Sequence, residues 1–406
     1  MYTDNTEVAN ISRWLNAVRN YGPITLCAIA GFLSAFTVSM VGLLPVGELV
    51  LALVFPWVLV RSIAYHGWPA RLQQLGWYKL LFVLIGVMAM GYIGSDLYRG
   101  TGSGNLIRGW ARVGFLAIDF VTIAYLIDSS WRRLFVFVFA LYLGNSLNAL
   151  LAGPLMGEWW KFGVGYTLTA IGLFAVAGRN PFLQVTVALI LGLLSLGLGA
   201  RSLGSICLLA AGLFWLRYAR GVLRPLAFVV MLGALAGMFT AANTVFIENQ
   251  DHAGSNMERQ SMIETAAEAF ISSPLVGQGS WFTASRISRL EERMERKDPT
   301  FRGYSEEEVR KISIHSQLLV ALAEGGVLGG LFFVFLGMLL LKTLRTLVNN
   351  PMPHRSFLFY LVIAGLWNLC MSPFSGVTRI EIALVVCACL LVILQQQGEL
   401  SEDYSE

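Results

Sequence analysis

Charged residues are scarce in this sequence of 406 residues: Asp, Glu, Lys and Arg make up 13%, whereas hydrophobic residues make up 56%. So little charge is not expected of a soluble chain of this length, and it favours an integral membrane protein. The small net charge of +4 gives no support to nucleic-acid binding. Apolar and polar residues do not alternate as in barrel strands, because stretches such as residues 182–200 are apolar on every face. The sequence therefore predicts an all-α polytopic membrane protein.

Several chemical motifs are also missing. The sequence contains no Asp-x-Asp pair, no P-loop and no dinucleotide-binding glycine motif. The five cysteines all fall in apolar segments without the spacing of a metal site or a disulfide framework, and we expect them to act as small hydrophobic residues. We therefore predict no metal and no cofactor.

About twelve apolar stretches are long enough to cross a bilayer. They cover residues 24–41, 46–64, 79–97, 108–127, 132–151, 160–177, 182–199, 203–218, 222–245, 315–342, 356–374 and 380–396. Lys and Arg are enriched in the short loops on one side, which places both termini in the cytoplasm. The predicted organisation is nine spans in residues 1–245, a large outer loop in residues 246–314, three spans in residues 315–396 and an acidic cytoplasmic tail in residues 397–406.

The outer loop is predicted to contain two helices. The first covers residues 257–272 and ends at the turn Pro-Leu-Val-Gly-Gln-Gly, from Pro274 to Gly279. Met262 and Ala266 recur at helical spacing on this helix, which predicts that it lies along the membrane. The second helix covers residues 286–297, whose dense opposite charges are most simply a solvated face with pairs four residues apart.

Among four histidines, His315 is the one that stands where the outer loop enters the membrane. An imidazole with an ordinary pKa of about 6.5 can be neutral at working pH and accept a proton, as a general base must. A histidine that only caps a helix is the structural alternative. Glu324 follows nine residues later, about 180° around the helix, so the two side chains cannot share one face.

Arg201 and Arg259 are the candidate anion ligands. Arg201 stands between two apolar spans, where a guanidinium needs an anionic partner or reaches the lipid headgroups. Arg259 opens the first loop helix. Because arginine binds phosphate oxygens with two hydrogen bonds, two arginines near one apolar surface suit a lipid pyrophosphate. An anchor to lipid headgroups is the structural alternative for Arg201.

Three further acids fall inside apolar segments: Asp119, Glu324 and Glu381. For Asp119 and Glu381 we expect structural pairing with an intramembrane arginine such as Arg112 or Arg379.

The string that begins at His315 resembles the signature of the O-antigen ligases. That family carries His, then Asn, Ser or Gln, nine residues, Gly, two residues, and Gly, Thr or Tyr, which His315, Ser316, Gly326 and Gly329 match. The structural alternative is that the two glycines serve ordinary packing between membrane helices. In either case we expect a neighbouring helix to approach closely there.

The family's second element is Arg-x-x-x-Leu in the loop. Arg286 with Leu290 fits it literally, whereas Arg259 is followed by Ile263. We prefer Arg259, because the family's arginine opens a helix that ends in a turn like Pro274 to Gly279, in which Gly277 and Gly279 supply the glycines. Arg286 is the reserve candidate. Arg201 is similar to the family's arginine at the outer end of an earlier hairpin.

The resemblance implies a glycosyltransferase C-like membrane fold in the bacterial inner membrane, with the active site facing the periplasm. It implies en bloc transfer of O-antigen glycan from undecaprenyl pyrophosphate to a sugar hydroxyl of lipid A-core, with inversion at the anomeric carbon and without a metal. His315 would be the general base, and Arg201 and Arg259 would bind the pyrophosphate.

Three alternatives remain. O-antigen polymerases and bacterial protein O-oligosaccharyltransferases use the same donor and differ in the acceptor. A secondary transporter is less well supported, because no internal repeat relates two halves of the chain.

Overall fold

The structure is a computed structural model that describes residues 21–39, 42–64, 71–152, 159–216, 250–282, 287–297, 302–303, 314–352 and 354–398. Its elements in chain order are a helix at Tyr21–Leu33, β1 (Thr37–Ser39), β2 (Leu43–Pro45), α2 (Val46–Ala64), α3 (Arg71–Gln74), α4 (Gly76–Arg99), α5 (Ser103–Ile127), α6 (Trp131–Ala152), the π-helix η1 (Trp160–Val164), α8 (Gly165–Ala175), α9 (Pro181–Gly197), α10 (Arg201–Leu216), α12 (Gln250–Ser272), α14 (Ile287–Lys297), α16 (Gln317–Asn349), α17 (Arg355–Met371) and α18 (Gly376–Gln396).

The described residues form a helical membrane protein. Five helices, α4, α5, α6, α16 and α18, are long and apolar enough to cross a membrane, and Tyr21–Leu33, α9, α10 and α17 are shorter apolar helices. The predicted helical, membrane-spanning class is thus confirmed. The count of twelve spans stays a prediction, and the predicted span at residues 222–245 lies outside the described residues.

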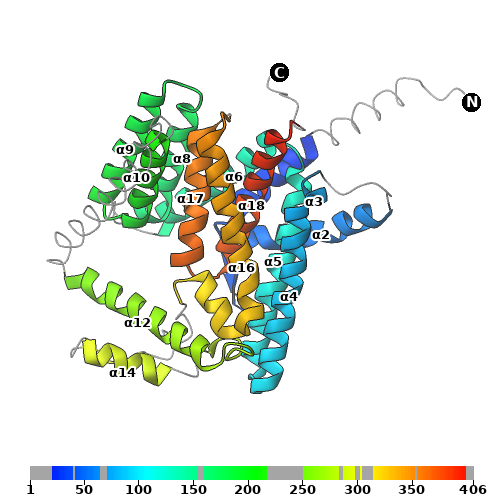
Figure 1. Cartoon of the computed structure of the whole chain (residues 1–406), viewed down its shortest axis with the longest axis vertical. Helices are drawn as coiled ribbons and strands as arrows, with labels where there is room; N and C mark the ends of the chain where they lie inside the picture. Colours follow the sequence, from blue (N-terminus) through cyan, green and yellow to red (C-terminus); the bar gives the residue numbers. More distant parts are fainter. Residues whose placement is uncertain are drawn as a thin grey trace, which may run out of the picture.

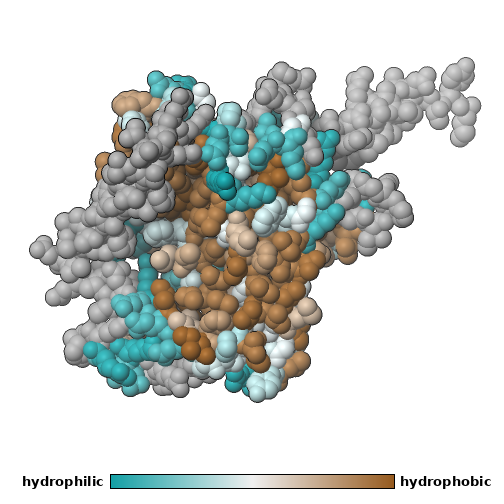
Figure 2. Space-filling model, viewed as in Figure 1, coloured by the Kyte–Doolittle hydropathy of each residue, from teal (hydrophilic) through white to brown (hydrophobic). Residues whose placement is uncertain are grey.

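Apolar side chains cover the middle of one face of the helices. Figure 2 shows hydrophobic side chains over the central part of one face, between hydrophilic ends. On α4, for example, Val83 is 61% exposed and Met90 is 62% exposed. Such side chains are matched to hydrocarbon rather than water, while each helix satisfies its own backbone hydrogen bonds.

Helix α16 lies at the centre of the bundle and contacts α4, α17 and α18 (Figure 1). The hairpin of α9 and α10 packs beside α8 and α17, and α5 packs against α2 and α18. The two loop helices, α12 and α14, lie together near one end of α16, at the lower left of Figure 1. This arrangement leaves the start of α16 between the bundle and the loop helices.

The first two predicted spans are separated by more than a tight turn. The first helix ends at Leu33, and β1 then pairs with β2 in antiparallel register, with Val38 opposite Leu44. Ser34 donates its hydroxyl to the carbonyl of Ala30 at 2.6 Å, a bond that competes with the helical pattern where the helix ends. The expectation of a helix to residue 41 is therefore wrong.

A buried ion pair ties α2 to α18. Arg379 donates from Nε and Nη2 to the two carboxylate oxygens of Glu48, at 2.8 and 2.7 Å. Asp119 of α5 lies beside Glu48 within the electrostatic field of Arg379. The expected pairing of Arg379 with Glu381 is not found, because Glu48 takes both guanidinium bonds and Glu381 bonds Asn368 instead.

Helix α16 is broken at Gly326, where φ is +65° and ψ is −158°. The turn from Pro274 to Gly279 enters the break so closely that a Cβ atom at Gly326 would collide with the carbonyl of Leu275. Gly277 and Gly279 also have positive φ, at +80° and +84°, which favours glycine. The close neighbour at Gly326 is therefore this turn and not the helix expected from the sequence.

The other glycines of the string do face a helix. A Cβ atom on Gly91 of α4 would lie 2.9 Å from the carbonyl oxygen of Gly325 and 3.0 Å from the amide nitrogen of Gly329. Small residues thus bring α4 and α16 into backbone contact, as in other membrane helix pairs.

Three backbone hydrogen bonds join the turn to the broken helix. They run from Val327 to Pro274 at 2.8 Å, from Gln278 to Ala323 at 2.8 Å and from Gly279 to Glu324 at 3.1 Å, donor first. These bonds occupy backbone groups of α16 that the break removes from the helical ladder. The turn therefore completes the hydrogen bonding of α16 in a buried region, where an unpaired backbone group is costly.

Substituting Gly326→Ala should destabilise the protein. An alanine there would have to adopt the positive-φ backbone of Gly326, which costs about 1–3 kcal/mol, and its side chain would also collide with the turn. Thermal unfolding in detergent should show a lower midpoint. The matched control is Gly86→Ala in α4, where no atom would lie within 4 Å of the new Cβ; its midpoint should be unchanged or slightly higher, and equal midpoints for the two variants would contradict the role of the break.

Candidate functional site

The start of α16 is capped by Ser316, which leaves the neighbouring His315 for another role. Ser316 accepts a hydrogen bond from the amide of Leu319 at 3.2 Å and has an extended backbone, as an N-cap residue does. Ser316 is buried, whereas His315 is half-buried. The residue that caps the helix is therefore Ser316, and not His315 as the structural alternative had it.

A cavity of about 530 Å³ lies beside this helix start. It is lined from α6, η1, α8, α10, α12, α16, α17 and α18, and also by His315, which precedes the N-cap residue of α16. Arg201, the first residue of α10, Arg259 of α12 and His315 all line it. The structure thus brings together three of the residues singled out in the sequence, which come from three separate parts of the chain.

The cationic groups in this cavity act on one another. The charge of Arg259 reaches both Arg201 and His315. Burial, and secondly the positive charge of Arg259, lower the pKa of His315 below its ordinary value. The imidazole is therefore neutral near pH 7 and able to accept a proton.

The charge of the cavity is mainly positive. Among the described residues that line it, Lys161, Arg201 and Arg259 carry positive charge and Glu381 is the one acid. No carboxylate among the described residues forms an ion pair with Arg259. Guanidiniums held near each other repel unless an anion lies between them, so this part of the cavity is suited to a phosphate or pyrophosphate.

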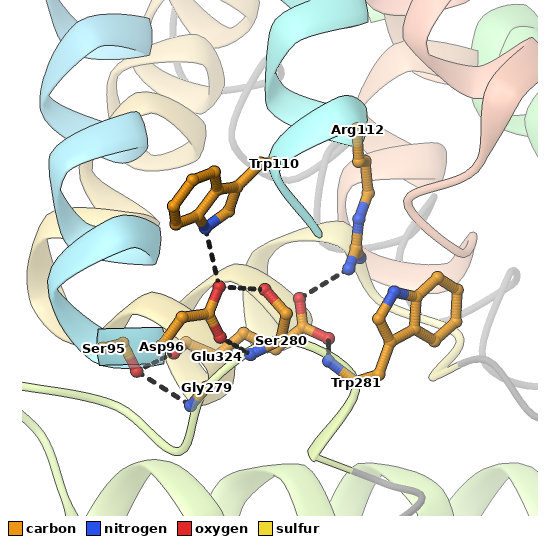
Figure 3. A network of polar contacts seen from close by, with 8 residues as sticks. All are labelled: Ser95, Asp96, Trp110, Arg112, Gly279, Ser280, Trp281 and Glu324. Carbon is orange, nitrogen blue, oxygen red and sulfur yellow. Dashed lines mark hydrogen bonds and ion pairs between the residues drawn. The ribbon is translucent and has the colours of Figure 1, made fainter. Parts of the chain in front are cut away.

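A network of polar contacts holds the loop turn in place (Figure 3). Asp96 of α4 accepts from the amide of Ser280 at 2.6 Å, from the Ser280 hydroxyl at 2.8 Å and from the indole nitrogen of Trp110 at 2.9 Å. The hydroxyl of Ser95 donates to the carbonyl of Glu324 at 2.7 Å and accepts from the amide of Gly279 at 2.8 Å. The turn is therefore held by α4 and α5 as well as by α16.

Arg99, the last residue of α4, adds two bonds to the same turn. Its Nε donates to the carbonyl of Gly277 at 3.0 Å, and its Nη2 donates to the hydroxyl of Ser273 at 2.7 Å.

A buried ion pair lies on the other side of the network. Arg112 of α5 donates to Glu324 at 2.8 Å, and the second carboxylate oxygen accepts from the amide of Trp281 at 2.9 Å. The guanidinium carbon lies 4.9, 5.3 and 5.8 Å from the ring centres of Trp281, Phe374 and Tyr92. Trp281 has a φ of +55°, an uncommon value for a bulky residue, which this set of contacts maintains.

The remaining predicted residues have different places. Gly277, Gly279, Gly326 and Gly329 do not line the cavity; they build the turn and the helix contact described above. Arg286, the reserve arginine, lies outside the described residues.

The loop helices differ from the prediction in their surroundings. Met262 and Ala266 of α12 are buried against protein, in a cluster with residues of α14 and the start of α16, and not against lipid. Arg293 of α14 pairs with Glu264 and Glu268 of α12, so the charged face also joins the two helices. Packing on α14 and α16 therefore fixes the helix that carries Arg259.

Sequence reasoning missed the network residues Asp96, Ser95 and Trp281, as well as the contribution of Lys161 to the cavity. Glu324 and Arg112 were noted as intramembrane charges, and that rarity was the signal available for them. Their pairing joins α5 to α16 between residues 212 positions apart in the sequence, which no local pattern encodes.

These features define a class: a multi-pass helical membrane protein in which a cationic cavity and a neutral histidine are held together by a loop docked into a broken helix. The model of the O-antigen ligase family matches residues 164–334, which include Arg201, Arg259, the turn and His315. The resemblance to this family that the sequence indicated is thus confirmed over this part of the chain. No curated protein matches the chain.

The family match supports membrane glycosyltransferase activity of the ligase or polymerase type. It also implies a lipid-linked glycan donor and an acceptor in the membrane.

Substituting Arg112→Leu should be strongly destabilising, because it leaves the carboxylate of Glu324 buried without its cation. Breaking a buried pair in this way costs about 3–5 kcal/mol. The control is Arg296→Leu, which breaks the exposed pair with Glu292 and should cost less than about 1 kcal/mol. Thermal unfolding in detergent measures both variants, and a similar small effect of the two would show that the buried pair is unimportant for the fold.

The His315 imidazole should titrate below the ordinary histidine pKa of about 6.5. Replacing Arg259 by Gln removes a positive charge that disfavours the imidazolium, so the pKa should rise; it should stay below the ordinary value, because burial remains. Histidine-selective NMR during a pH titration, assigned by loss of one signal in His315→Ala, measures both values. A His315 pKa at or above 6.5 in the wild-type protein would contradict this account of the site.

Proposed function

We propose that the protein transfers O-antigen glycan en bloc from undecaprenyl pyrophosphate to a sugar hydroxyl of lipid A-core, at the periplasmic face of the bacterial inner membrane. The observation that carries the proposal is the convergence of Arg201, Arg259 and His315 on one cavity. A pyrophosphate-linked donor needs a cationic site at its leaving group, and a hydroxyl acceptor needs a base. The cavity provides both.

The two arginines have the role of holding the pyrophosphate. Their guanidiniums come from α10 and from the loop helix α12, so an anion between them is approached from two sides. Binding of the pyrophosphate relieves their mutual repulsion. As the bond from the anomeric carbon to the pyrophosphate oxygen lengthens, negative charge grows on the leaving group, and the arginines stabilise it in the transition state.

His315 has the role of general base. Its neutral imidazole takes the proton of the acceptor hydroxyl while the hydroxyl oxygen forms a bond to the anomeric carbon. Undecaprenyl pyrophosphate leaves from the opposite face, so direct attack inverts the anomeric centre. The imidazolium then returns its proton to solvent. The two cations supply the electrostatic stabilisation that a metal supplies in other transferases, and we therefore expect transfer without a divalent ion.

The alternatives share this donor chemistry. A polymerase would transfer the glycan to another lipid-linked glycan, and a protein O-oligosaccharyltransferase would transfer it to a hydroxyl of a protein. The string from His315 to Gly329 favours the ligase, because it follows the ligase pattern at all four fixed positions. A secondary transporter remains the alternative from another class.

The test is glycan transfer by purified protein in detergent with EDTA, using lipid-linked O-antigen as donor and lipid A-core as acceptor. Wild type should form the product. His315→Ala should lower the rate by about 10²–10⁴, and Arg259→Ala or Arg201→Ala by about 10²–10³. Arg345→Ala, which removes an arginine that does not line the cavity, is the control and should be fully active.

Different outcomes separate the alternatives. Elongation of the donor, or glycosylation of a protein, without transfer to lipid A-core would replace the ligase by the corresponding alternative. Counterflow transport without any transfer would indicate a transporter. Full activity of His315→Ala would contradict its role as base even if the ligase activity stands.

A further inference from the structure

The cavity has a second polar centre that the transfer mechanism does not use. Glu381 of α18 and Asn368 of α17 both line it, on membrane helices rather than on the loop. Glu381 has no arginine or lysine partner among the described residues. A carboxylate without a cation in an apolar bundle is costly, and such residues commonly mark a binding function.

A chain of hydrogen bonds fixes the orientation of this carboxylate. The hydroxyl of Ser372 donates to Oδ1 of Asn368 at 2.8 Å, and Nδ2 of Asn368 donates to Oε2 of Glu381 at 2.8 Å. Because the serine hydroxyl and the carboxylate require opposite ends of the amide, the amide orientation follows from the network. The second oxygen, Oε1, has no donor among the described residues and is available to the cavity.

The surroundings of Glu381 fit a sugar ring. The same cavity is lined by three aromatic residues, Trp367, Tyr142 and Tyr166. The two tyrosines are close enough to Glu381 to interact with it electrostatically. Aromatic side chains present a flat apolar face together with a polar edge. A pyranose has apolar C–H faces and a rim of hydroxyls, and an ionised carboxylate accepts hydrogen bonds from hydroxyls strongly.

Glu381 is also connected to the cationic end of the cavity. Tyr166 and Ser202, the residue after Arg201, both line the cavity and interact with each other. An occupant that reaches from Arg201 to Glu381 would therefore pass from an anion-binding region to a hydroxyl-binding region within one cavity of about 530 Å³.

We propose that Glu381 and Asn368 form a saccharide subsite in which Oε1 of Glu381 accepts a hydrogen bond from a sugar hydroxyl. The inference rests on the proposed function for the identity of the ligand at the cationic end, and it adds a specificity-determining pair to that reaction. The sugar belongs either to the donor, as the residue attached to the pyrophosphate, or to the acceptor.

The variant Glu381→Gln tests the subsite with little change in shape. Asn368 donates to the side chain at position 381, so the new amide must turn its oxygen toward Asn368 and its NH2 group toward the cavity. The cavity then loses a carboxyl oxygen as acceptor and gains an amide donor. Loss of a hydrogen bond weakens binding by up to about tenfold.

The experiment measures dissociation constants of purified protein in detergent for three probes. They are undecaprenyl pyrophosphate without sugar, undecaprenyl pyrophosphate carrying O-antigen, and soluble deacylated core oligosaccharide. Glu381→Gln should bind the first probe as wild type does and should bind at least one of the sugar-bearing probes about tenfold more weakly. The control Glu292→Gln makes the same chemical change on an exposed face of α14 and should bind all three normally.

Each outcome decides the proposal. Weaker binding of the O-antigen donor alone assigns the subsite to the donor, and weaker binding of the core oligosaccharide alone assigns it to the acceptor. Unchanged binding of both sugar probes overturns it, and so does an equal loss for all three, which would mean a general structural effect. If wild type transfers no glycan but Glu381→Gln shows the selective loss of sugar binding, the subsite stands and the proposed reaction fails. If wild type transfers glycan normally and Glu381→Gln binds the sugar probes as wild type does, the proposed reaction stands and the subsite fails.

Discussion

The docking of the Pro274 to Gly279 turn into the break of α16 is the constraint on which the rest of the structure depends. The break at Gly326 takes backbone groups out of the helical ladder, and the turn replaces their partners with three hydrogen bonds. Neither segment is complete without the other, because unpaired backbone groups are costly in this buried region. The turn ends α12, which carries Arg259, and the broken half-helix begins just after His315. One contact therefore fixes the loop arginine relative to the histidine.

Two groups of charged residues in the molecule have different surroundings. Arg112 with Glu324, and Arg379 with Glu48, are paired in the interior, where each partner compensates the other and where removing one would leave a buried charge. Arg201, Arg259 and Lys161 line one cavity, with one acid among its described lining residues. Like charges held together lower stability, and natural proteins keep such arrangements where function requires them. The paired charges hold the fold, and we interpret the gathered charges as the binding site.

The sequence predicted the loop helices well because helical periodicity is encoded locally. The loop helices predicted at 257–272 and 286–297 are found at Gln250–Ser272 and Ile287–Lys297. Prediction from the sequence failed where tertiary contacts determine the local structure. The break of α16 looks like an ordinary glycine in an apolar helix, and the short strands after Leu33 look like the end of a span.

In the candidate site, too, some residues could be predicted from the sequence and others depend on tertiary contacts. His315, Arg201 and Arg259 were found because each is a polar residue where an apolar run begins or ends, and the structure places all three on one cavity. Glu381 was noted, but its partner Asn368 is on another helix, and the expectation of an arginine partner was wrong. Asp96 and Ser95, which hold the turn, look in the sequence like the polar end of a membrane helix.

The most direct test of the central claim is a cryo-EM structure of the protein in a lipid nanodisc with undecaprenyl pyrophosphate bound. The account predicts density for the pyrophosphate between the guanidiniums of Arg201 and Arg259, with the His315 imidazole facing the same cavity and the turn seated in the break of α16. Pyrophosphate bound elsewhere, with this cavity closed to it, would contradict the account.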